Sequence, residues 1–167
     1  MSDKIIKFLA HNGKISVICA DTTEMVEKAR QTHDMRPVVT AGFGRLLTIT
    51  AIMATEMKGS KDKLTVQLKG NGSIGLMIAT ANNKPIVKGY ATNPVVDIPL
   101  NEDGKLDVGG AVGYEGYINV VKDLGLKDPY IGISPLVSGE IAEDFANYFV
   151  NSEQRSRRPS GLRKTIN

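Results

Sequence analysis

The sequence contains no tryptophan, one cysteine and two histidines, and these shortages exclude several kinds of protein. A single cysteine, Cys19, cannot form an intramolecular disulfide framework or a multi-cysteine metal site. Aromatic residues make up only 5% of the chain, so we expect aliphatic side chains and methionine to fill the core. No apolar run reaches the roughly 18 residues of a membrane span, and the first residues do not form a signal peptide. We therefore expect a cytoplasmic protein with no membrane partner.

A broad excess of charge is also lacking, because the formal net charge of +3 belongs to one short segment. Residues 155–167 hold five basic residues and no acidic residue. Removing these five from the 21 basic residues leaves 16 against 18 acidic residues in residues 1–154, a net charge of −2. Domains that bind nucleic acid usually gather lysine and arginine on one face. We therefore expect no nucleic-acid partner for residues 1–154.

What the sequence does contain is typical of one globular domain, with 41% hydrophobic and 23% charged residues in a chain of 167. Its first part predicts two strands, over Lys4–Ala10 and residues 14–20, joined by a turn at Asn12-Gly13. Next, Asp21-Thr22-Thr23-Glu24 has the pattern of a capping box. In it, the Asp21 carboxylate accepts an early helical N–H and Glu24 reaches back, so we expect a helix to begin here.

The second predicted helix is apolar almost all round. Pro37 is well suited to open it, and residues 38–57 are interrupted mainly by Arg45, several threonines and Glu56. A helix that is apolar on every side is normally buried on every side. Gly42 and Gly44 each cost about 1 kcal/mol relative to alanine in a helix, which a close approach of a neighbouring backbone would explain. We therefore expect this helix to lie between two layers.

After residue 57 the apolar period changes to two, which predicts antiparallel strands. The expected elements are strands over residues 64–69, 74–79 and 85–91, a long loop over 93–110, two short strands within 111–121, and an extended segment over 129–137. Ser138 is expected to begin the final helix, with early carboxylates that favour the positive end of its dipole. Its apolar stripe, which should dock on the core, consists of Ile141, Phe145, Tyr148 and Phe149.

One motif suggests nucleotide chemistry, because Gly70-Asn71-Gly72-Ser73-Ile74-Gly75 matches G-x-G-x-x-G after a strand. The dinucleotide mechanism requires a helix to begin there, so that its N-terminus holds the pyrophosphate. Here the chain continues as a strand. A hairpin turn is therefore the favoured interpretation of the Gly70–Gly75 loop, and a nucleotide site is the alternative.

The remaining reactive side chains do not assemble into a catalytic pattern. Cys19 ends a predicted strand among apolar residues, so we expect it to be buried and inert. The two histidines, His11 and His33, lack the spacing of metal ligands or triad partners. Ser138 lacks the G-x-S-x-G context of a nucleophile, and helix capping explains it better.

Carboxylates near the final helix are the last candidate ligands. Glu140, Glu143 and Asp144 could bind a metal, but charge–dipole balance at a helix start explains them more simply. We therefore predict no catalytic residue, no cofactor-binding residue and no metal ligand in this chain, and no enzymatic activity.

Several segments taken together resemble one known family. They are Asp21-Thr22-Thr23-Glu24-Met25-Val26, Gly44-Arg45-Leu46-Leu47, Lys69-Gly70-Asn71-Gly72-Ser73-Ile74-Gly75, Gly89-Tyr90 with Asn93-Pro94, Gly104-Lys105-Leu106-Asp107-Val108-Gly109-Gly110-Ala111-Val112-Gly113, Leu136-Val137-Ser138-Gly139-Glu140-Ile141-Ala142-Glu143-Asp144, and Tyr148-Phe149 with Ser152-Glu153-Gln154. In this order and spacing they closely resemble the N-terminal domain of the heat shock protein 33 family, the redox-regulated holdase chaperones. The resemblance covers nearly all of residues 1–154.

The resemblance implies a fold, an activity and a partner class. The fold is an α+β, β/α/β sandwich with a buried central helix, which agrees with the independent interpretation of residues 38–57. The activity is the ATP-independent holding of unfolding client proteins under stress, which prevents their aggregation. In the family, oxidation activates the chaperone by releasing zinc from a C-terminal module of four cysteines. The family also tends to dimerise.

The chain departs from the family after Gln154. Residues 155–167 resemble nothing in it, and we expect them to be a disordered basic tail that arose by truncation, frameshift or addition of vector residues. The core domain is then incomplete at its C-terminal end. No zinc-ligating cysteine is present, and Cys19 matches none of the module's ligands. Zinc binding and the thiol switch therefore do not carry over to these residues.

Our leading hypothesis is an ATP-independent holdase that binds unfolded or partly folded clients and lacks the redox-sensing module. No motif identifies the client-binding residues or shows whether the fragment is active alone. We expect a homodimer in which strands or helices are exchanged, because strand edges left open invite pairing with a second copy. The alternatives are a nucleotide-binding enzyme that uses the Gly70–Gly75 loop and an RNA-binding module that uses the basic tail.

Overall fold

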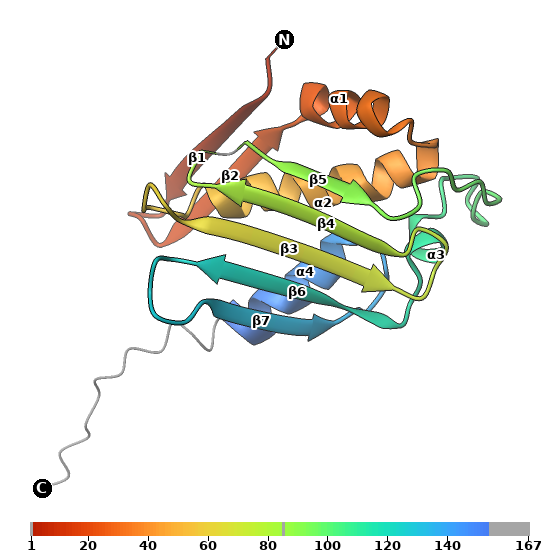
Figure 1. Ribbon diagram of the computed structural model, residues 1–167. Helices are drawn as coiled ribbons and strands as arrows, with labels where there is room; N and C mark the ends of the chain where they lie inside the picture. The colour runs from red at the N-terminus through yellow and green to blue at the C-terminus, as the bar shows by residue number, and fades with distance from the viewer. Residues whose placement is uncertain (1, 85, 154–167) are drawn as a thin grey trace, which may run out of the picture.

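The structure, a computed structural model, describes residues 2–84 and 86–153. A five-stranded antiparallel sheet forms one layer, and helices α2 (Pro37–Ala54) and α4 (Ala142–Tyr148) lie against its inner face (Figure 1). A separate hairpin, β1 (Lys4–Ala10) and β2 (Ile15–Asp21), and helix α1 (Thr23–His33) lie beyond α2. The predicted α+β class with a central helix between two sheets is confirmed.

The N-terminal hairpin forms where the sequence predicted it, and its turn contains residues in the left-handed region. His11, Asn12 and Gly13 have φ values of 50°, 54° and 81°, and Gly13 N–H donates to the Ala10 carbonyl at 3.1 Å. Glycine and asparagine tolerate this backbone at little steric cost. The turn therefore closes the two strands with Lys4 opposite Asp21.

The start of α1 differs from the predicted capping box. Asp21 Oδ1 does accept the Thr23 N–H at 3.2 Å, but the N-cap residue, Thr22, makes no side-chain cap bond. The free N–H groups of the first turn are instead satisfied by Asp3, whose carboxylate accepts from Glu24 and Met25 at 2.8 Å each. Asp3, about twenty positions upstream, thus caps α1 in place of the local capping box that the sequence predicted.

Helix α2 begins at Pro37 as predicted and ends at Ala54, before the expected residue 57. Its length and composition would allow it to cross a membrane, but 61% of it is buried inside the protein, as in the core helix of a globular domain. The expectation of burial on every side is wrong for one face. Ala41, Thr48 and Ile49 are only partly buried and Arg45 is exposed, because no layer covers them among the described residues.

The prediction that a neighbouring backbone approaches the two glycines of α2 is wrong, because only side chains lie near them. A Cβ at Gly44 would lie 2.8 Å from Val26 Cγ1 on α1. A Cβ at Gly42 would lie 3.5 Å from Val108 Cγ1, which is ordinary contact. Only Gly44 is therefore required for the approach of α1 to α2.

The five strands of the main sheet are β3 (Lys63–Gly70), β4 (Leu76–Asn82), β5 (Lys88–Ala91), β6 (Gly116–Asp123) and β7 (Tyr130–Pro135), in the order β5-β4-β3-β6-β7. The predicted meander is confirmed, although its third strand begins only at Lys88. Alternate residues of β3, namely Leu64, Val66 and Leu68, are fully buried against the helices. The intervening side chains form the outer face of the sheet.

Two predictions for the second half are corrected. In place of two short strands within 111–121, the chain forms the end of a short helix, α3 (Val108–Val112), and then one strand, β6, which begins at Gly116. Asp107 Oδ1 accepts the Gly110 N–H at 2.8 Å and so caps α3. The final helix begins at Ala142 rather than Ser138 and continues as a π-helical turn, η1 (Phe149–Glu153). Its apolar stripe packs on the core as predicted, with Phe145 and Tyr148 at 1% and 0% exposure. The proposed domain boundary at Gln154 and the tail over 155–167 lie outside the described residues.

Candidate functional site

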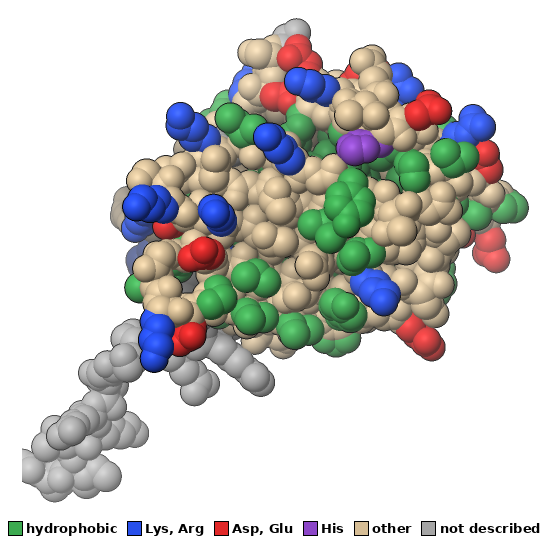
Figure 2. All heavy atoms as spheres, in the orientation of Figure 1, with side chains coloured by type: hydrophobic (Ala, Val, Ile, Leu, Met, Phe, Trp, Pro, Cys, Tyr) green, Lys and Arg blue, Asp and Glu red, His purple; other side chains and the backbone are tan. Residues whose placement is uncertain are grey.

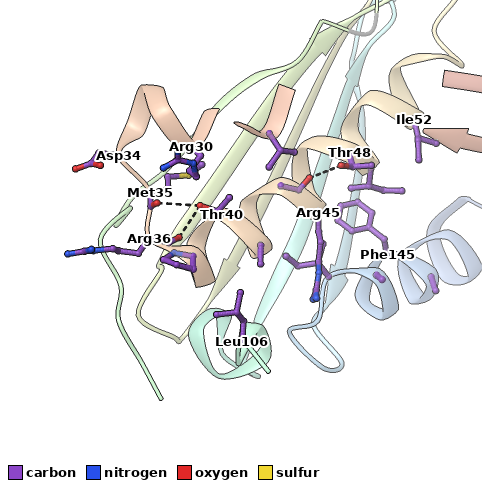
Figure 3. A pocket seen from close by; sticks show the side chains of 18 of the residues that line it. Arg30, Asp34, Met35, Arg36, Thr40, Arg45, Thr48, Ile52, Leu106 and Phe145 are labelled. Carbon is purple, nitrogen blue, oxygen red and sulfur yellow. Dashed lines mark hydrogen bonds between the residues drawn. The ribbon is translucent and has the colours of Figure 1, made fainter. Parts of the chain in front are cut away.

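A long hollow runs along the uncovered face of α2, and we call it the α2 groove (Figure 3). Its volume is about 1060 Å³. Helix α2 forms its floor, α1 and the turn that follows it form one wall, and α4 with the segment before it forms the other. The floor residues are Thr40, Ala41, Gly44, Arg45, Thr48, Ile49 and Ile52.

The hydroxyl groups of the two floor threonines are engaged in hydrogen bonds to backbone carbonyls of α2 and its N-cap. Thr40 Oγ1 donates to the Arg36 carbonyl at 3.0 Å, and Thr48 Oγ1 donates to the Gly44 carbonyl at 2.8 Å (Figure 3). Thr48 Oγ1 also lies 2.7 Å from Thr22 Oγ1, which ties the start of α1 to α2. Because these hydroxyl groups already have hydrogen-bond partners, the two threonines add little polarity to the floor.

Apolar side chains also dominate the walls. Val26 lines the groove from α1, and Leu106 lines it from the loop before α3. From the opposite side, the lining includes Ile141, Phe145 and Phe149. Phe145 and Phe149 pack with their ring centroids 6.2 Å apart. A continuous apolar hollow of this size is typical of a binding site.

Each of the three arginines at the groove is paired with an acidic side chain. Arg45 Nη1 lies 2.6 Å from Glu140 Oε2, and Arg36 Nε lies 3.5 Å from Asp97 Oδ2. Arg30 makes two 2.8 Å bonds to Glu27. These hydrogen bonds, first from Arg30 and then from Gln31, lower the pKa of Glu27 to about 2. The groove therefore offers no unmatched arginine to a ligand.

One buried carboxylate holds the wall segment before α4 in place. Asp144 is 0% exposed, and its Oδ1 accepts the N–H groups of Val137 at 2.7 Å and Ser138 at 3.0 Å. Its Oδ2 accepts the Ile141 N–H at 2.9 Å, with Ile141 at a φ of 66°. Asp144 thus fixes the loop that brings Glu140 to Arg45.

The outer face of the main sheet is a second partly apolar surface (Figure 2). Tyr90, Ile131 and Ile133 are 48%, 57% and 63% exposed there. Gln67 and Asn119 interrupt this surface as direct partners on β3 and β6, with 3.5 Å between their amides. The apolar side chains consequently form separate groups in Figure 2 rather than one hollow, so the α2 groove is the stronger candidate site.

The Gly70–Gly75 loop is a hairpin connection, as predicted, and no helix follows it, since β4 begins at Leu76. The N–H groups of Gly72 and Ile74 donate to the carbonyls of Val112 and Ala111 at 2.8 and 3.0 Å. A Cβ at Gly72 would collide with the Ala111 carbonyl. Gly72 therefore leaves the space that the end of α3 occupies. The N–H groups of Gly72 and Ile74 are not available to a phosphate, because they already bind carbonyls.

The predicted burial of Cys19 is wrong, because its side chain is exposed on β2. The hairpin has apolar residues on both faces, and no element covers the outer one among the described residues. His11 lies in the hairpin turn, and His33 packs edge-on against Phe43 with ring centroids 6.4 Å apart. The structure brings neither histidine to the groove lining.

The carboxylates near α4 have three different environments and do not converge. Glu140 precedes the helix and contacts Arg45, Glu143 is exposed in the first turn of α4, and Asp144 binds backbone N–H groups. Ser138 Oγ accepts the Glu140 N–H at 3.2 Å, so it shapes a turn rather than a helix cap. Within the described residues, no three histidine, cysteine or acidic side chains are grouped as metal ligands.

The groove itself was missed by the sequence analysis. A signal was present, because Thr40, Gly44 and Thr48 repeat every four residues along an otherwise apolar helix. That spacing marks one face of a helix. It does not by itself show that this face is open, because Gly44 is buried while Thr40 and Thr48 are only partly buried.

Comparisons with known proteins agree with one another. The Hsp33 protein family model matches residues 3–159. The 33 kDa chaperonin of Thermoanaerobacter sp. (strain X514) is 51% identical over 154 residues, covering 92% of this chain and 52% of that protein. The 33 kDa chaperonin of Clostridioides difficile (strain 630) is also 51% identical, with coverage of 92% and 53%.

A solved structure is similar as well. The crystal structure of the 33 kDa chaperonin (heat shock protein 33 homolog) from Thermotoga maritima has a TM-score of 0.84 and 41% sequence identity. The match covers 90% of this chain and 51% of that one. The chain therefore spans about half the length of the relatives it matches.

Proposed function

Because the chain belongs to the Hsp33 family, we propose that it holds unfolding proteins without ATP and binds their apolar segments in the α2 groove. The observation that carries this proposal is the uncovered apolar face of the central helix. A hollow of about 1060 Å³ slightly exceeds the roughly 300–1,000 Å³ typical of ligand pockets. It is large enough to accept several side chains of a partner together.

Independence from ATP is supported by the glycine-rich loop. Its Gly72 and Ile74 N–H groups already bind carbonyls of α3, so the loop lacks the free donors of a phosphate cradle. Holding a client in an apolar hollow needs no covalent step. The proposed activity is thus binding and not catalysis. We propose that it takes place in the cytoplasm.

The zinc chemistry of the family does not fit the residues of this chain. A structural zinc site of four thiolates needs four cysteines, and the sequence has only Cys19. We therefore propose an activity that does not depend on zinc or on a thiol switch. Client affinity then comes from the apolar floor and walls of the groove.

Self-association is part of the same proposal. Each strand of the hairpin has one edge without a partner among the described residues. Open edges favour pairing or exchange of elements between copies. We propose a homodimer, which sedimentation velocity over a range of concentrations would test; a monomer at all concentrations would contradict it.

Light scattering of a heat-aggregating client enzyme tests the holdase activity. We expect the wild-type chain to suppress scattering at equimolar ratio, and I49E, which places a charge on the groove floor, to lose most of this effect. The matched control is I131E, at an exposed isoleucine on the outer sheet face, which should retain it. Circular dichroism confirms that both variants are folded.

Two outcomes would contradict the proposal. If the wild-type chain does not suppress scattering, it is not a holdase. If I131E loses the activity and I49E keeps it, clients bind the outer sheet face rather than the groove.

A further inference from the structure

We propose that residues 137–141, the loop before α4, act as a gate at one wall of the α2 groove. In the position described here the gate is shut, because Glu140 joins it to Arg45 on the groove floor. In the open position this contact is broken, the loop leaves Asp144, and Ile141 returns to a negative φ. The inference goes beyond the proposed client binding, and it does not depend on what occupies the groove.

The first observation is a strained backbone at Ile141. Its φ and ψ are 66° and −51°, and the Ala142 N–H donates to the Glu140 carbonyl at 2.7 Å. This combination is a γ-turn of the rare, strained kind. A β-branched residue adopts a positive φ only at a steric cost, and such a conformation persists where the surrounding contacts impose it.

Two sets of contacts impose this turn. The Ile141 side chain is 1% exposed and lines the groove, and its Cδ1 lies 3.8 Å from the Cβ position of Gly42 on α2. The buried Asp144 carboxylate accepts four N–H groups of the loop, those of Val137, Ser138, Gly139 and Ile141. The turn is strained because the loop must serve the apolar core and the buried carboxylate at once.

The second observation is that the N–H groups of the loop are bonded locally. Four of them donate to Asp144, and the fifth, from Glu140, donates to Ser138 Oγ at 3.2 Å. Within the described residues, none of these five N–H groups donates to a strand of the sheet or to α2. The loop can therefore move without breaking a hydrogen bond of the main sheet.

The third observation is that Glu140 fastens the loop to α2 and α3. Its Oε2 lies 2.6 Å from Arg45 Nη1, and its Oε1 accepts the Gly109 N–H at 3.2 Å. Arg45 points from α2 toward this loop in Figure 3. Both charged side chains are 43% exposed, and ion pairs that water reaches are weak. The closed loop thus combines a strained turn with a weak latch, which is the arrangement expected of a gate.

A pair of variants tests the strain. I141A and I141G both remove the side chain, so the difference between them reports on the backbone. At an unstrained position glycine is the less stable of the two, because it has more freedom in the unfolded chain. We expect the opposite order here, with a higher urea midpoint for I141G, because glycine adopts a positive φ without strain. The usual order would show that Ile141 is not strained and would overturn the inference.

Native-state hydrogen exchange tests the opening of the loop. E140Q keeps the shape of the side chain and removes the charge that pairs with Arg45. We expect E140Q to speed the exchange of the amides bound to Asp144 about fivefold, while the amides of β3 stay unchanged. The matched control is E143Q, which removes a charge from an exposed residue in the first turn of α4 and should change neither set.

Two results of this experiment would overturn the gate. If E140Q leaves the exchange of the loop amides unchanged, the contact with Arg45 does not hold the loop. If the β3 amides accelerate by the same factor, the loop opens only when the whole domain unfolds. The light-scattering assay fails separately, because a wild-type chain that suppresses no aggregation contradicts the proposed function and leaves the exchange result as it is.

Discussion

At the scale of single residues, Glu27 balances the positive charge of Arg30 on the groove wall. Its carboxylate accepts two hydrogen bonds from Arg30 and one from Gln31 at 2.7 Å. These bonds favour the ionised form and lower the pKa of Glu27 from 4.5 to about 2. Protonation of Glu27 would weaken its pairing with Arg30 beside the apolar floor.

The pH dependence of this pair follows from the sign of the shift. Because the pKa is lower in the folded state, the pair stabilises the fold above pH 4.5, and this contribution is lost as the pH falls through about 2. We expect NMR titration of the Glu27 carboxyl to give a midpoint near 2. In R30A the midpoint should move back toward 4.5, and only partly, because Gln31 still donates. A wild-type midpoint near 4.5 would contradict the hydrogen-bonded geometry.

At the scale of elements, the spacing between α1 and α2 is set by Gly44. The Cβ position at Gly44 points at Val26, a β-branched side chain with little rotational freedom. At Gly42, one half-turn earlier, the same atom would have only ordinary contacts with Val108 and Ile74. Gly44 is thus required by the packing of α1 on α2, whereas Gly42 could be replaced by alanine without a clash.

Alanine substitutions should separate these roles in urea denaturation. We expect G42A to raise the free energy of unfolding by about 0.5–1 kcal/mol, because alanine is the better helix former and fits without a clash. G44A should lower it by about 1–2 kcal/mol, because Val26 must move. The double variant G44A/V26A should recover part of the loss. If the single variant G44A raised the free energy of unfolding, α1 would be able to move away from α2 without loss of stability, and the predicted clash with Val26 would be contradicted.

The elements themselves were largely predictable, because their signals are local. Alternation predicted the meander, Pro37 marked the start of α2, and the i, i+4 stripe at Ile141 and Phe145 predicted a docked final helix. The start of that helix was not predictable from spacing. It depends on Asp144, whose carboxylate binds a preceding loop instead of merely balancing a helix dipole.

At the scale of the whole molecule, the unpredicted features are those that depend on which layer covers which. Cys19 lies among apolar residues, as buried cysteines do, yet it is exposed because nothing within residues 2–84 and 86–153 covers the outer face of the hairpin. The open face of α2 has the same origin. Periodicity shows that a face is apolar, but only the arrangement of layers shows whether it is buried.

The response to oxidant is a property of the whole chain, because it depends on the total number of thiols. With Cys19 as the single cysteine, no intramolecular disulfide can form. We expect suppression of client aggregation to be the same before and after treatment with peroxide, in wild type and in C19S alike. A gain with peroxide in wild type that C19S abolishes would contradict this and assign a switch to Cys19.

The cap that Asp3 provides for α1 has a consequence for local unfolding. Helix α1 has no fully buried residue, and two N–H groups of its first turn are satisfied only while the start of β1 stays in place. The hairpin and α1 therefore behave as one cooperative unit that opens and closes together. Since Val26 and Arg30 belong to that unit, we expect one wall of the groove to open whenever the hairpin and α1 unfold locally.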